Sequence, residues 1–160
     1  MASKTNAVRL VHQAKIAYRE AFYDFDENDL SGIHAAKAIG LPQEQVYKTL
    51  VTRGPKTGVH VFCIPVCCEL DLKKAAKVAK DKYIEMVQVK ELLQLTGYIR
   101  GGCSPIGMKK KYVTKVDESA KELMTMIVSG GKIGVQLELK PEDLLKACDG
   151  AFADLIVKAN

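Results

Sequence analysis

A glycine-rich segment in the second half of the chain is the first feature whose composition could do chemistry. The eleven residues from Gly97 to Gly107 include four glycines and one proline, together with apolar side chains. Glycine has no side chain, so the backbone N–H groups of such a loop can approach a ligand closely. Two amides from Gly101 and Gly102, directed at one carbonyl oxygen, could stabilise a tetrahedral intermediate. The same composition is also typical of a purely structural turn, and glycine content alone does not separate the two interpretations.

Lys48 is the second residue that could take part in chemistry. It lies within residues 46–52, where β-branched side chains indicate a strand. Depending on the register of that strand, Lys48 faces either the interior of the sheet or the solvent. An inward-facing lysine would need a polyanion or an acidic partner, whereas an outward-facing strand lysine is the commoner case.

The sequence shows none of the usual sets of nucleophile and base. The histidines, His12, His34 and His60, have no spacing that pairs them with a serine or cysteine nucleophile. The glycine-rich segment also lacks the lysine and hydroxyl residue that follow the glycines in phosphate-binding loops, and Pro105 has no N–H to donate. A conventional nucleophilic hydrolase or nucleotide-binding loop is therefore not indicated.

The five cysteines are Cys63, Cys67, Cys68, Cys103 and Cys148. Their odd number and irregular spacing favour free thiols in a reducing compartment over a disulfide framework. Cys63 and Cys67 lack the further ligands that a zinc site requires, so we expect no metal. Cys103 lies inside the glycine-rich loop, and we interpret it as a small packing residue because no base is evident to form its thiolate.

Basic residues are clustered in two places. The net charge is +5, which is compatible with a polyanionic partner. The first cluster lies in one short segment and consists of Lys73, Lys74, Lys77 and Lys80. The second is a continuous run of Lys109, Lys110 and Lys111. Either cluster could equally be a solvated face.

The overall composition indicates one ordinary globular domain. The chain has 160 residues, of which 48% are hydrophobic and 27% charged, so we predict a single domain over residues 1–160 with its own core. No apolar run approaches the roughly 20 residues that span a bilayer. The N-terminus has no charged-then-apolar leader, and we therefore expect a cytoplasmic protein that makes no membrane contact.

The elements that must position Gly101 and Lys48 can be predicted from caps and periodicity. Helices are predicted over 5–11, 31–39, 70–79, 89–95 and 118–122, and from 141 onward. Strands are predicted over 18–25, 46–52, 59–66, 83–87, 112–116, 124–128 and 133–139, with a turn at 129–131. Short connections favour antiparallel pairs, and the absence of repeated βαβ units argues against a doubly wound parallel sheet. The expected fold class is therefore mixed α/β.

Five motifs occur in one order along the chain and together carry a family resemblance. They are Thr5-Asn6-Ala7-Val8, Val46-Tyr47-Lys48-Thr49-Leu50, Leu70-Asp71-Leu72-Lys73-Lys74, Gly97-Tyr98-Ile99-Arg100-Gly101-Gly102-Cys103-Ser104-Pro105-Ile106-Gly107 and Val128-Ser129-Gly130-Gly131-Lys132. In this combination they closely resemble the YbaK/EbsC-type proteins, which edit mischarged prolyl-tRNA. The resemblance runs over nearly the whole chain.

The resemblance implies a fold and an activity. The implied fold is a compact α/β editing domain, with a mixed, largely antiparallel sheet or a flattened barrel flanked by helices. The implied activity is deacylation of Cys-tRNA(Pro), and by extension Cys-tRNA(Cys), in the cytoplasm with no metal or organic cofactor. It implies mischarged tRNA(Pro) as substrate, prolyl-tRNA synthetase as partner, and a monomer or weak homodimer. In the family picture the thiol of the substrate attacks its own ester and leaves as a thiolactone, which would also allow classification as a lyase.

The resemblance also implies roles for individual residues. The essential lysine of the family falls on Lys48, and the glycine of its Gly-x-x-x-Pro motif falls on Gly101, with Pro105 at the end of the motif. The neighbouring Gly102 is also expected to be catalytic. The implied substrate-binding residues are Tyr23, Thr49, Cys103, Ser104, Pro105, Ser129, Gly130 and Gln136. Some family members carry an aspartate where this chain has Gln136, which puts in doubt any role that requires a carboxylate there.

The resemblance also implies a partner for the two lysine clusters, namely the phosphates of tRNA. Phosphate contacts from lysines give affinity and salt dependence with little reading of sequence. The residues expected to contact tRNA are Lys73, Lys74, Lys77, Lys109, Lys110 and Lys111. Two other functions stay open: a deacylase of the same fold specific for alanine or another small amino acid on tRNA(Pro), and a non-catalytic member that binds tRNA or a nucleotide. An association of the family with envelope properties finds no support in this chain.

Overall fold

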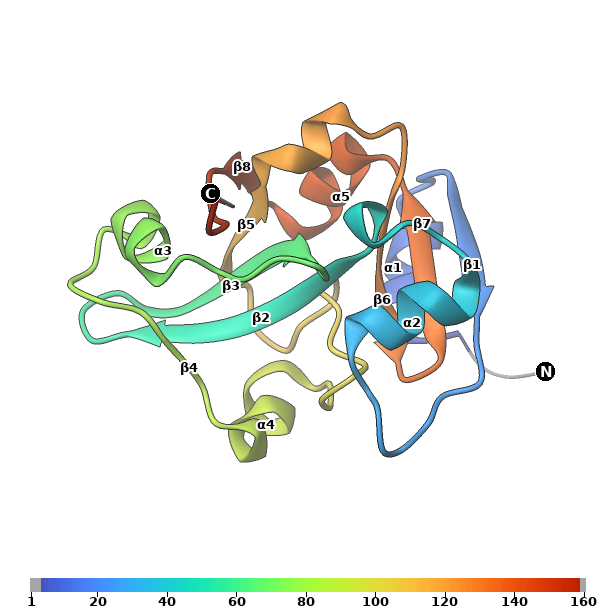
Figure 1. The fold of residues 1–160 in the computed structure, drawn as a ribbon, viewed down its shortest axis with the longest axis horizontal. Coiled ribbons are helices and arrows are strands. Elements are labelled where there is room, and N and C mark those ends of the chain that lie inside the picture. The colour runs from blue at the N-terminus through green and yellow to red at the C-terminus, as the bar shows by residue number, and fades with distance from the viewer. Residues whose placement is uncertain (1–3, 159–160) are drawn as a thin grey trace.

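The computed structural model describes residues 4–158, which form two open β-sheets flanked by helices (Figure 1). The helices are α1 (Asn6–Gln13), α2 (Gly32–Ile39), α3 (Leu72–Ala79), α4 (Leu92–Thr96) and α5 (Pro141–Cys148), with short 3-10 helices η1 (Gln43–Gln45), η2 (Val89–Glu91) and η3 (Glu118–Glu122). The strands are β1 (Tyr18–Phe22), β2 (Tyr47–Gly54), β3 (Gly58–Pro65), β4 (Glu85–Met86), β5 (Val113–Asp117), β6 (Met126–Lys132), β7 (Val135–Leu139) and β8 (Ala151–Ala153). None of the helices within residues 4–158 has the length and apolar character needed to cross a bilayer.

The two sheets confirm the mixed α/β class. The first has the order β1-β7-β6, and both of its pairs are antiparallel. The second has the order β4-β2-β3-β5-β8, in which β3–β5 and β5–β8 are parallel and the other pairs antiparallel. A parallel bridge between Val46 and Ile127 links the start of β2 to β6. The sheets are therefore adjacent but open, and the flattened barrel considered as an alternative does not form.

The predicted helix caps are confirmed at several ends. The side-chain oxygen of Thr5 accepts a hydrogen bond from the Val8 amide at the start of α1. Ser31 does the same for the His34 amide at the start of α2. That helix ends at Gly40, whose φ of 75° lies in the left-handed region that favours glycine. These boundaries depend on local chemistry, which explains why the sequence predicts them.

The turn predicted at 129–131 is wrong. These residues lie inside β6, which continues to Lys132 and pairs with β7. The ladder carries a bulge between Ser129 and Lys132, with Gly131 at a φ of 97°. Glycine at positive φ is typical of a bulge as well as of a turn. The chain instead turns at Ile133 and Gly134, between β6 and β7.

Two predicted strands are shorter than expected. The strand predicted over 18–25 ends at Phe22, because its last ladder partner is Val135, the first residue of β7. The strand predicted over 83–87 is reduced to Glu85 and Met86, which pair at the edge of the sheet with Arg53 and Thr52. In both cases the length is set by how far the neighbouring strand extends.

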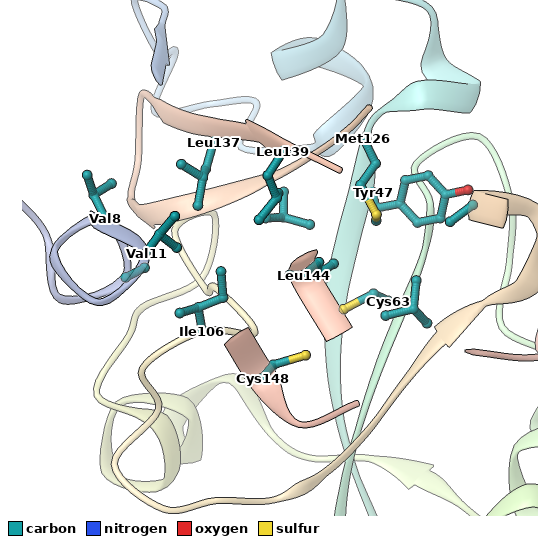
Figure 2. Packing of buried hydrophobic residues seen from close by; sticks show 14 residues of the cluster. Val8, Val11, Tyr47, Cys63, Ile106, Met126, Leu137, Leu139, Leu144 and Cys148 are labelled. Carbon is teal, nitrogen blue, oxygen red and sulfur yellow. The ribbon is translucent and has the colours of Figure 1, made fainter. Parts of the chain in front are cut away.

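The main core gathers side chains from α1, α5, both sheets and the glycine-rich loop (Figure 2). Leu137 and Leu139 of β7 pack there with Leu144 of α5, and each is at most 1% exposed. Ile106, from the glycine-rich loop, is fully buried in the same cluster. The loop is thus fixed to the core at this point, although its backbone is irregular.

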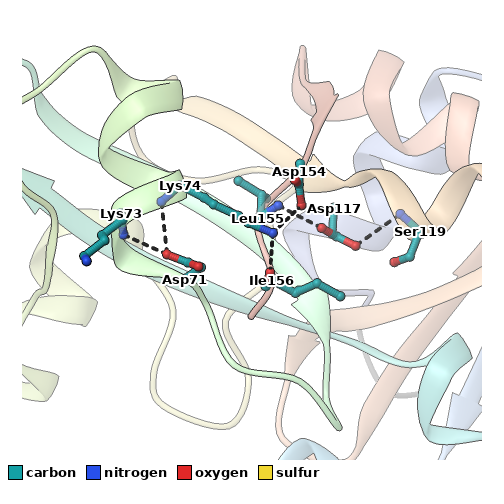
Figure 3. A network of polar contacts seen from close by, with 8 residues as sticks. All are labelled: Asp71, Lys73, Lys74, Asp117, Ser119, Asp154, Leu155 and Ile156. Atoms are coloured by element: carbon teal, nitrogen blue, oxygen red, sulfur yellow. Dashed lines mark hydrogen bonds and ion pairs between the residues drawn. The ribbon is translucent and has the colours of Figure 1, made fainter. Parts of the chain in front are cut away.

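A polar network fixes the C-terminal segment beside α3 (Figure 3). The Asp117 carboxylate accepts hydrogen bonds from the Leu155 amide at 3.0 Å and the Ser119 amide at 3.1 Å. Lys74 donates to the Asp154 carboxylate at 2.9 Å and to a backbone carbonyl of the same segment at 2.8 Å. Lys74 of the predicted tRNA-binding cluster therefore has a structural role in the fold.

Truncation of the core should lower stability in proportion to the buried volume removed. We expect Leu144→Ala to reduce the free energy of unfolding by about 2–5 kcal/mol, because a fully buried leucine leaves a cavity. The matched control is Leu93→Ala, at a side chain that is 54% exposed, where a change within about 0.5 kcal/mol is expected. Urea unfolding followed by circular dichroism measures both, and equal losses of stability would contradict this assignment of the core.

Candidate functional site

A cavity of about 360 Å³ lies where the two sheets meet the glycine-rich loop. Its lining comes from the N-terminus of α2, the start of β2, the loop after α4, and the pair β6–β7. The lining residues are Tyr23, Leu30, Ser31, Gly32, Ile33, Ala35, Val46, Tyr47, Lys48, Thr49, Leu50, Val66, Arg100, Gly101, Cys103, Ser129 and Gln136. Segments far apart in the chain therefore meet around one hollow.

Many of the residues predicted from the sequence line this one cavity. Lys48 and Thr49 come from β2, and Gly101 and Cys103 from the glycine-rich loop; Tyr23, Ser129 and Gln136 come from the three-stranded sheet and its continuation. The structure thus brings together the two features that composition alone left as separate possibilities, the lysine strand and the glycine loop.

Four of the predicted residues, Gly102, Ser104, Pro105 and Gly130, do not line this cavity. The Gly102 amide donates to the Ile99 carbonyl at 3.0 Å, so it already has an acceptor within the loop. Ser104 is fully buried, and its hydroxyl accepts a hydrogen bond from a loop amide at 3.2 Å. The carbonyl of Gly130 accepts a hydrogen bond from the side chain that caps α1. Pro105 lines a second cavity of about 120 Å³.

Gly102 is held in place by close backbone packing. A Cβ atom at this position would lie 2.8 Å from the Ile133 nitrogen and 3.0 Å from the Lys132 carbonyl carbon. These atoms belong to the turn between β6 and β7, which cannot move aside as a flexible side chain would. Glycine at 102 is therefore required for the loop to approach that turn.

The rest of the loop is fixed by hydrogen bonds. The Tyr98 hydroxyl donates to the Ile106 carbonyl at 2.5 Å across the loop. The side-chain amide of Asn6 on α1 donates to the Gly107 carbonyl at 2.8 Å. Gly101, between these anchors, has a φ of 86°, a conformation that other residues adopt with strain. The loop is consequently a preorganised backbone surface at the edge of the cavity.

Two amides of this loop are candidate donors to a ligand. Those of Gly101 and Cys103 donate to no carbonyl or side chain within residues 4–158, and both residues line the cavity. Buried backbone amides nearly always find an acceptor. A bound oxygen atom is therefore a natural partner for these groups.

The cavity is electropositive. Lys48 is half-buried and forms no ion pair with any carboxylate of the described chain. Arg100 supplies a second cation at the rim. Of the described lining residues, none is aspartate, glutamate or histidine. The cavity thus favours an anionic ligand and offers no general base among its lining side chains.

Cys103 has the character of a packing residue. It is 9% exposed, and burial raises the pKa of its thiol to about 11. A thiol with this pKa is protonated at neutral pH and is a poor nucleophile. The Cys103 sulfur is therefore not a candidate nucleophile, which leaves its backbone amide as the group of chemical interest.

Gln136 is a buried polar group on the wall of the cavity. It is 5% exposed and lies opposite Ser129 in the β6–β7 register. The Gln136 side chain has no hydrogen-bond partner among the residues that the structure describes, whereas the Ser129 hydroxyl accepts from the Gly131 amide at 3.1 Å. A glutamine here can both donate and accept a hydrogen bond without adding a negative charge.

The N-terminus of α2 is a component that the sequence analysis missed. Ser31, Gly32 and Ile33 line the cavity, and the first turn of a helix carries a partial positive charge with unsatisfied N–H groups. The predicted cap at Ser31 located this helix end but not the cavity that it faces. Arg100 was also missed, because a single arginine beside glycines has no distinctive spacing.

The predicted tRNA-binding lysines lie outside the cavity. Lys73 and Lys77 are exposed on α3, beside the engaged Lys74. Lys109 and Lys110 are exposed and follow the glycine-rich loop directly, whereas Lys111 pairs with a carboxylate, that of Asp149, at 3.3 Å. No group of three or more metal-ligating side chains occurs within the described part of the chain.

Comparison with known proteins places this chain in one family. Residues 30–147 match the model of the aminoacyl-tRNA editing domain. Because this match covers most of the chain, the protein belongs to the aminoacyl-tRNA editing domain family.

Individual relatives agree with that assignment. The chain is 48% identical to EbsC of Enterococcus faecalis, described as a presumed Cys-tRNA(Pro)/Cys-tRNA(Cys) deacylase, over 97% of this chain and 94% of that protein. It is 26% identical to YwhH of Bacillus subtilis, an uncharacterised protein, over 76% of each chain. A solved structure described as a presumed trans-editing enzyme for prolyl-tRNA synthetase has the same fold, with a TM-score of 0.80 and 23% identity over 98% of this chain and all of that one.

The contact at Gly102 can be tested by adding one methyl group. We expect Gly102→Ala to lower the free energy of unfolding by about 1–3 kcal/mol through overpacking and to shift the NMR signals of the Gly101 and Cys103 amides. The control is Gly40→Ala, where a Cβ meets no atom within 4 Å and only backbone strain is introduced. Unchanged loop amide signals in Gly102→Ala would contradict the proposed role of this contact.

Proposed function

We propose that this protein is a trans-editing aminoacyl-tRNA deacylase that clears Cys-tRNA(Pro), and also Cys-tRNA(Cys). The observation that carries the proposal is the convergence of Lys48 and the Gly101 amide on one electropositive cavity without a lining acid or base. The description of EbsC, a relative at 48% identity, supports the same substrate. Deacylation here means cleavage of the ester that joins cysteine to the terminal ribose of the tRNA.

The charges and donors of the cavity fit the two ends of this substrate. Lys48, Arg100 and the N-terminus of α2 attract the phosphate and ribose of the terminal nucleotide. The amides of Gly101 and Cys103 can donate to the ester carbonyl, where negative charge develops during cleavage. Lys48 thus acts electrostatically, and the loop amides act as the oxyanion-binding group.

The substrate supplies the nucleophile in this mechanism. Its cysteine sulfur attacks the ester carbonyl carbon, a C–S bond forms, and the C–O bond to the ribose breaks. The thiol proton passes to the ribose oxygen, so the products are a cyclic thiolactone and an uncharged tRNA with a free hydroxyl. Holding a reacting pair in the correct geometry can lower a barrier by roughly 7 kcal/mol or more. A lyase-type release of this kind needs no protein nucleophile, which agrees with the protonated Cys103.

Gln136 and Ser129 complete the binding site for the amino acid. Both line the wall formed by β6 and β7, where their oxygens can accept hydrogen bonds from the substrate ammonium group. The neutral Gln136 replaces the carboxylate found in some relatives. Recognition of the ammonium group therefore rests on dipoles here rather than on an ion pair.

The body of the tRNA requires contacts beyond the cavity. We assign these to the exposed lysines that follow the loop and those on α3, with prolyl-tRNA synthetase as the partner that selects the tRNA in the cytoplasm. A domain of this size is too small to hold the acceptor end and the anticodon together, because a folded chain of this length has a radius of gyration of only about 15 Å. The protein would act as a monomer or weak homodimer.

Substrate specificity distinguishes thiol-assisted cleavage from general hydrolysis. Purified protein should deacylate Cys-tRNA(Pro) and leave Ala-tRNA(Pro) largely intact, because alanine has no nucleophile to position. Release of labelled amino acid from the two substrates, compared with a no-enzyme control, measures this. Equal rates would eliminate the thiol-assisted mechanism, and faster cleavage of Ala-tRNA(Pro) would favour the alanine-specific alternative.

Removal of the cavity cation tests the electrostatic role of Lys48. We expect Lys48→Ala to slow deacylation about 10²–10³-fold, as seen when a group that stabilises transition-state charge is removed. The control is Lys82→Ala, at an exposed lysine outside the cavity. A folded Lys48→Ala protein with the rate of the parent would remove this residue from the site.

Salt dependence tests the binding of the tRNA body. We expect Lys109→Gln combined with Lys110→Gln to weaken tRNA binding and to reduce the slope of log affinity against log salt by about one for each lysine that binds a phosphate. The comparison is Lys73→Gln combined with Lys77→Gln on α3. Filter binding over a range of salt concentrations measures both, and a flat salt dependence of the parent protein would refute phosphate binding by these lysines.

A further inference from the structure

The segment after β3 holds two neighbouring thiols that the proposed mechanism does not use. Cys67 is exposed, Cys68 is half-buried, and their Sγ atoms lie 3.8 Å apart. The other three cysteines, Cys63, Cys103 and Cys148, are each at most 9% exposed. An oxidant in solution therefore meets this pair first, because the susceptibility of a thiol follows its exposure.

The same segment forms part of the cavity wall. Val66, the residue before the pair, lines the cavity, and its amide donates to the Val46 carbonyl at 2.8 Å. Its side chain packs on the backbone of Gly32 at the start of α2, where an added Cβ would lie 2.3 Å from the valine Cγ1. There is thus no free space between this segment and the helix end that faces the cavity.

The surroundings of Cys68 also connect the pair to the site. Burial raises the pKa of the Cys68 thiol to about 11, and the nearby Lys48 cation opposes that rise. Because a protonated thiol is a weak nucleophile, we expect Cys68 to react second, after Cys67 has been oxidised. The exposed Cys67 is the thiol that an incoming reagent reaches first.

We propose that Cys67 and Cys68 form a reversible oxidation site, at which a hydroperoxide converts the two thiols into a vicinal disulfide and thereby alters the wall of the cavity. The Cys67 thiol releases its proton, and the thiolate attacks a peroxide oxygen, so that an S–O bond forms and the O–O bond breaks. The departing alkoxide or hydroxide takes up that proton and leaves as an alcohol or water. The Cys68 sulfur then attacks the sulfenic sulfur, an S–S bond forms, the S–O bond breaks and water leaves. Two thiols are oxidised and one hydroperoxide is reduced.

Geometry makes this disulfide a labile one. Adjacent residues across a trans peptide have Cα atoms about 3.8 Å apart, whereas disulfides usually join Cα atoms about 4.4–6.8 Å apart. A bond formed outside that range stores strain and is more easily reduced, which is typical of regulatory rather than structural disulfides. Cellular thiols can therefore reverse the change.

Closure of the pair must move the segment that carries Val66. The sulfur atoms have to approach from 3.8 Å to about 2.05 Å, with a change in the backbone between them. Because the Val66 side chain packs closely against Gly32, a movement of Val66 also moves the N-terminus of α2, which lines the cavity. This consequence for deacylation rests on the proposed function, whereas the thiol chemistry itself does not.

The experiment treats the purified full-length protein with hydrogen peroxide and follows three readouts. Intact mass should fall by two hydrogens, and peptide mapping without reductant should place the new bond between Cys67 and Cys68. Hydrogen exchange of the Val66 amide should become faster in the oxidised protein. Deacylation of Cys-tRNA(Pro) should fall on oxidation and return on addition of dithiothreitol.

Matched variants assign the effect to this pair. Cys67→Ser and Cys68→Ser should each prevent the two-hydrogen loss, whereas Cys63→Ala, at a buried cysteine of the same tryptic peptide, should retain it. Stable sulfenic acid at Cys67, or disulfides only between molecules, would overturn the assignment. A vicinal disulfide that leaves both Val66 exchange and deacylation unchanged would overturn the coupling to the cavity. If the reduced protein deacylates nothing, the proposed function fails, while mass and exchange still decide the oxidation site.

Discussion

The close contact between Gly102 and the turn from Lys132 to Ile133 is the constraint on which the cavity depends. Only a hydrogen atom fits between these two backbones, so the glycine-rich loop and the three-stranded sheet are held at a fixed separation. Ile106 anchors the loop to the core on one side, and on the other side Gly101 lines the same cavity as Lys48. A loop without regular secondary structure thereby becomes a rigid wall.

Electrostatics then determine what the cavity can do. Its charged lining residues are cations, and the buried Cys103 stays protonated at neutral pH because burial raises its pKa to about 11. Such a lining suits the anionic, oxygen-rich ligand that we propose, and it offers no protein nucleophile. This combination of strong positioning and weak intrinsic reactivity suits a substrate that carries its own thiol.

The sequence predicts the parts of this structure that depend on local chemistry. The caps at Ser31 and Gly40 are local, and so is the hairpin of β2 and β3. The family resemblance pairs Lys48 with the Gly101 loop, and the structure places both on one cavity. Composition alone left the role of each open, because spacing along the chain does not reveal which distant segments meet.

Other features depend on non-local packing and were predicted incorrectly or not at all. Residues 129–131 have turn-like composition, but pairing with β7 holds them in a bulged strand. The engagement of the Gly102 amide by Ile99 moves the candidate donors to Gly101 and Cys103. The contribution of the α2 N-terminus depends on how that helix packs against Val66, which no local pattern encodes.

A crystal structure with a stable substrate analogue tests the central claim most directly. The analogue is adenosine carrying cysteine through an amide bond at its terminal ribose, which mimics the ester but resists cleavage. We expect its carbonyl oxygen within about 2.7–3.1 Å of the Gly101 or Cys103 amide nitrogen, with the ribose end directed toward Lys48. An analogue bound outside this cavity, or bound with its carbonyl directed away from the loop amides, would contradict the account.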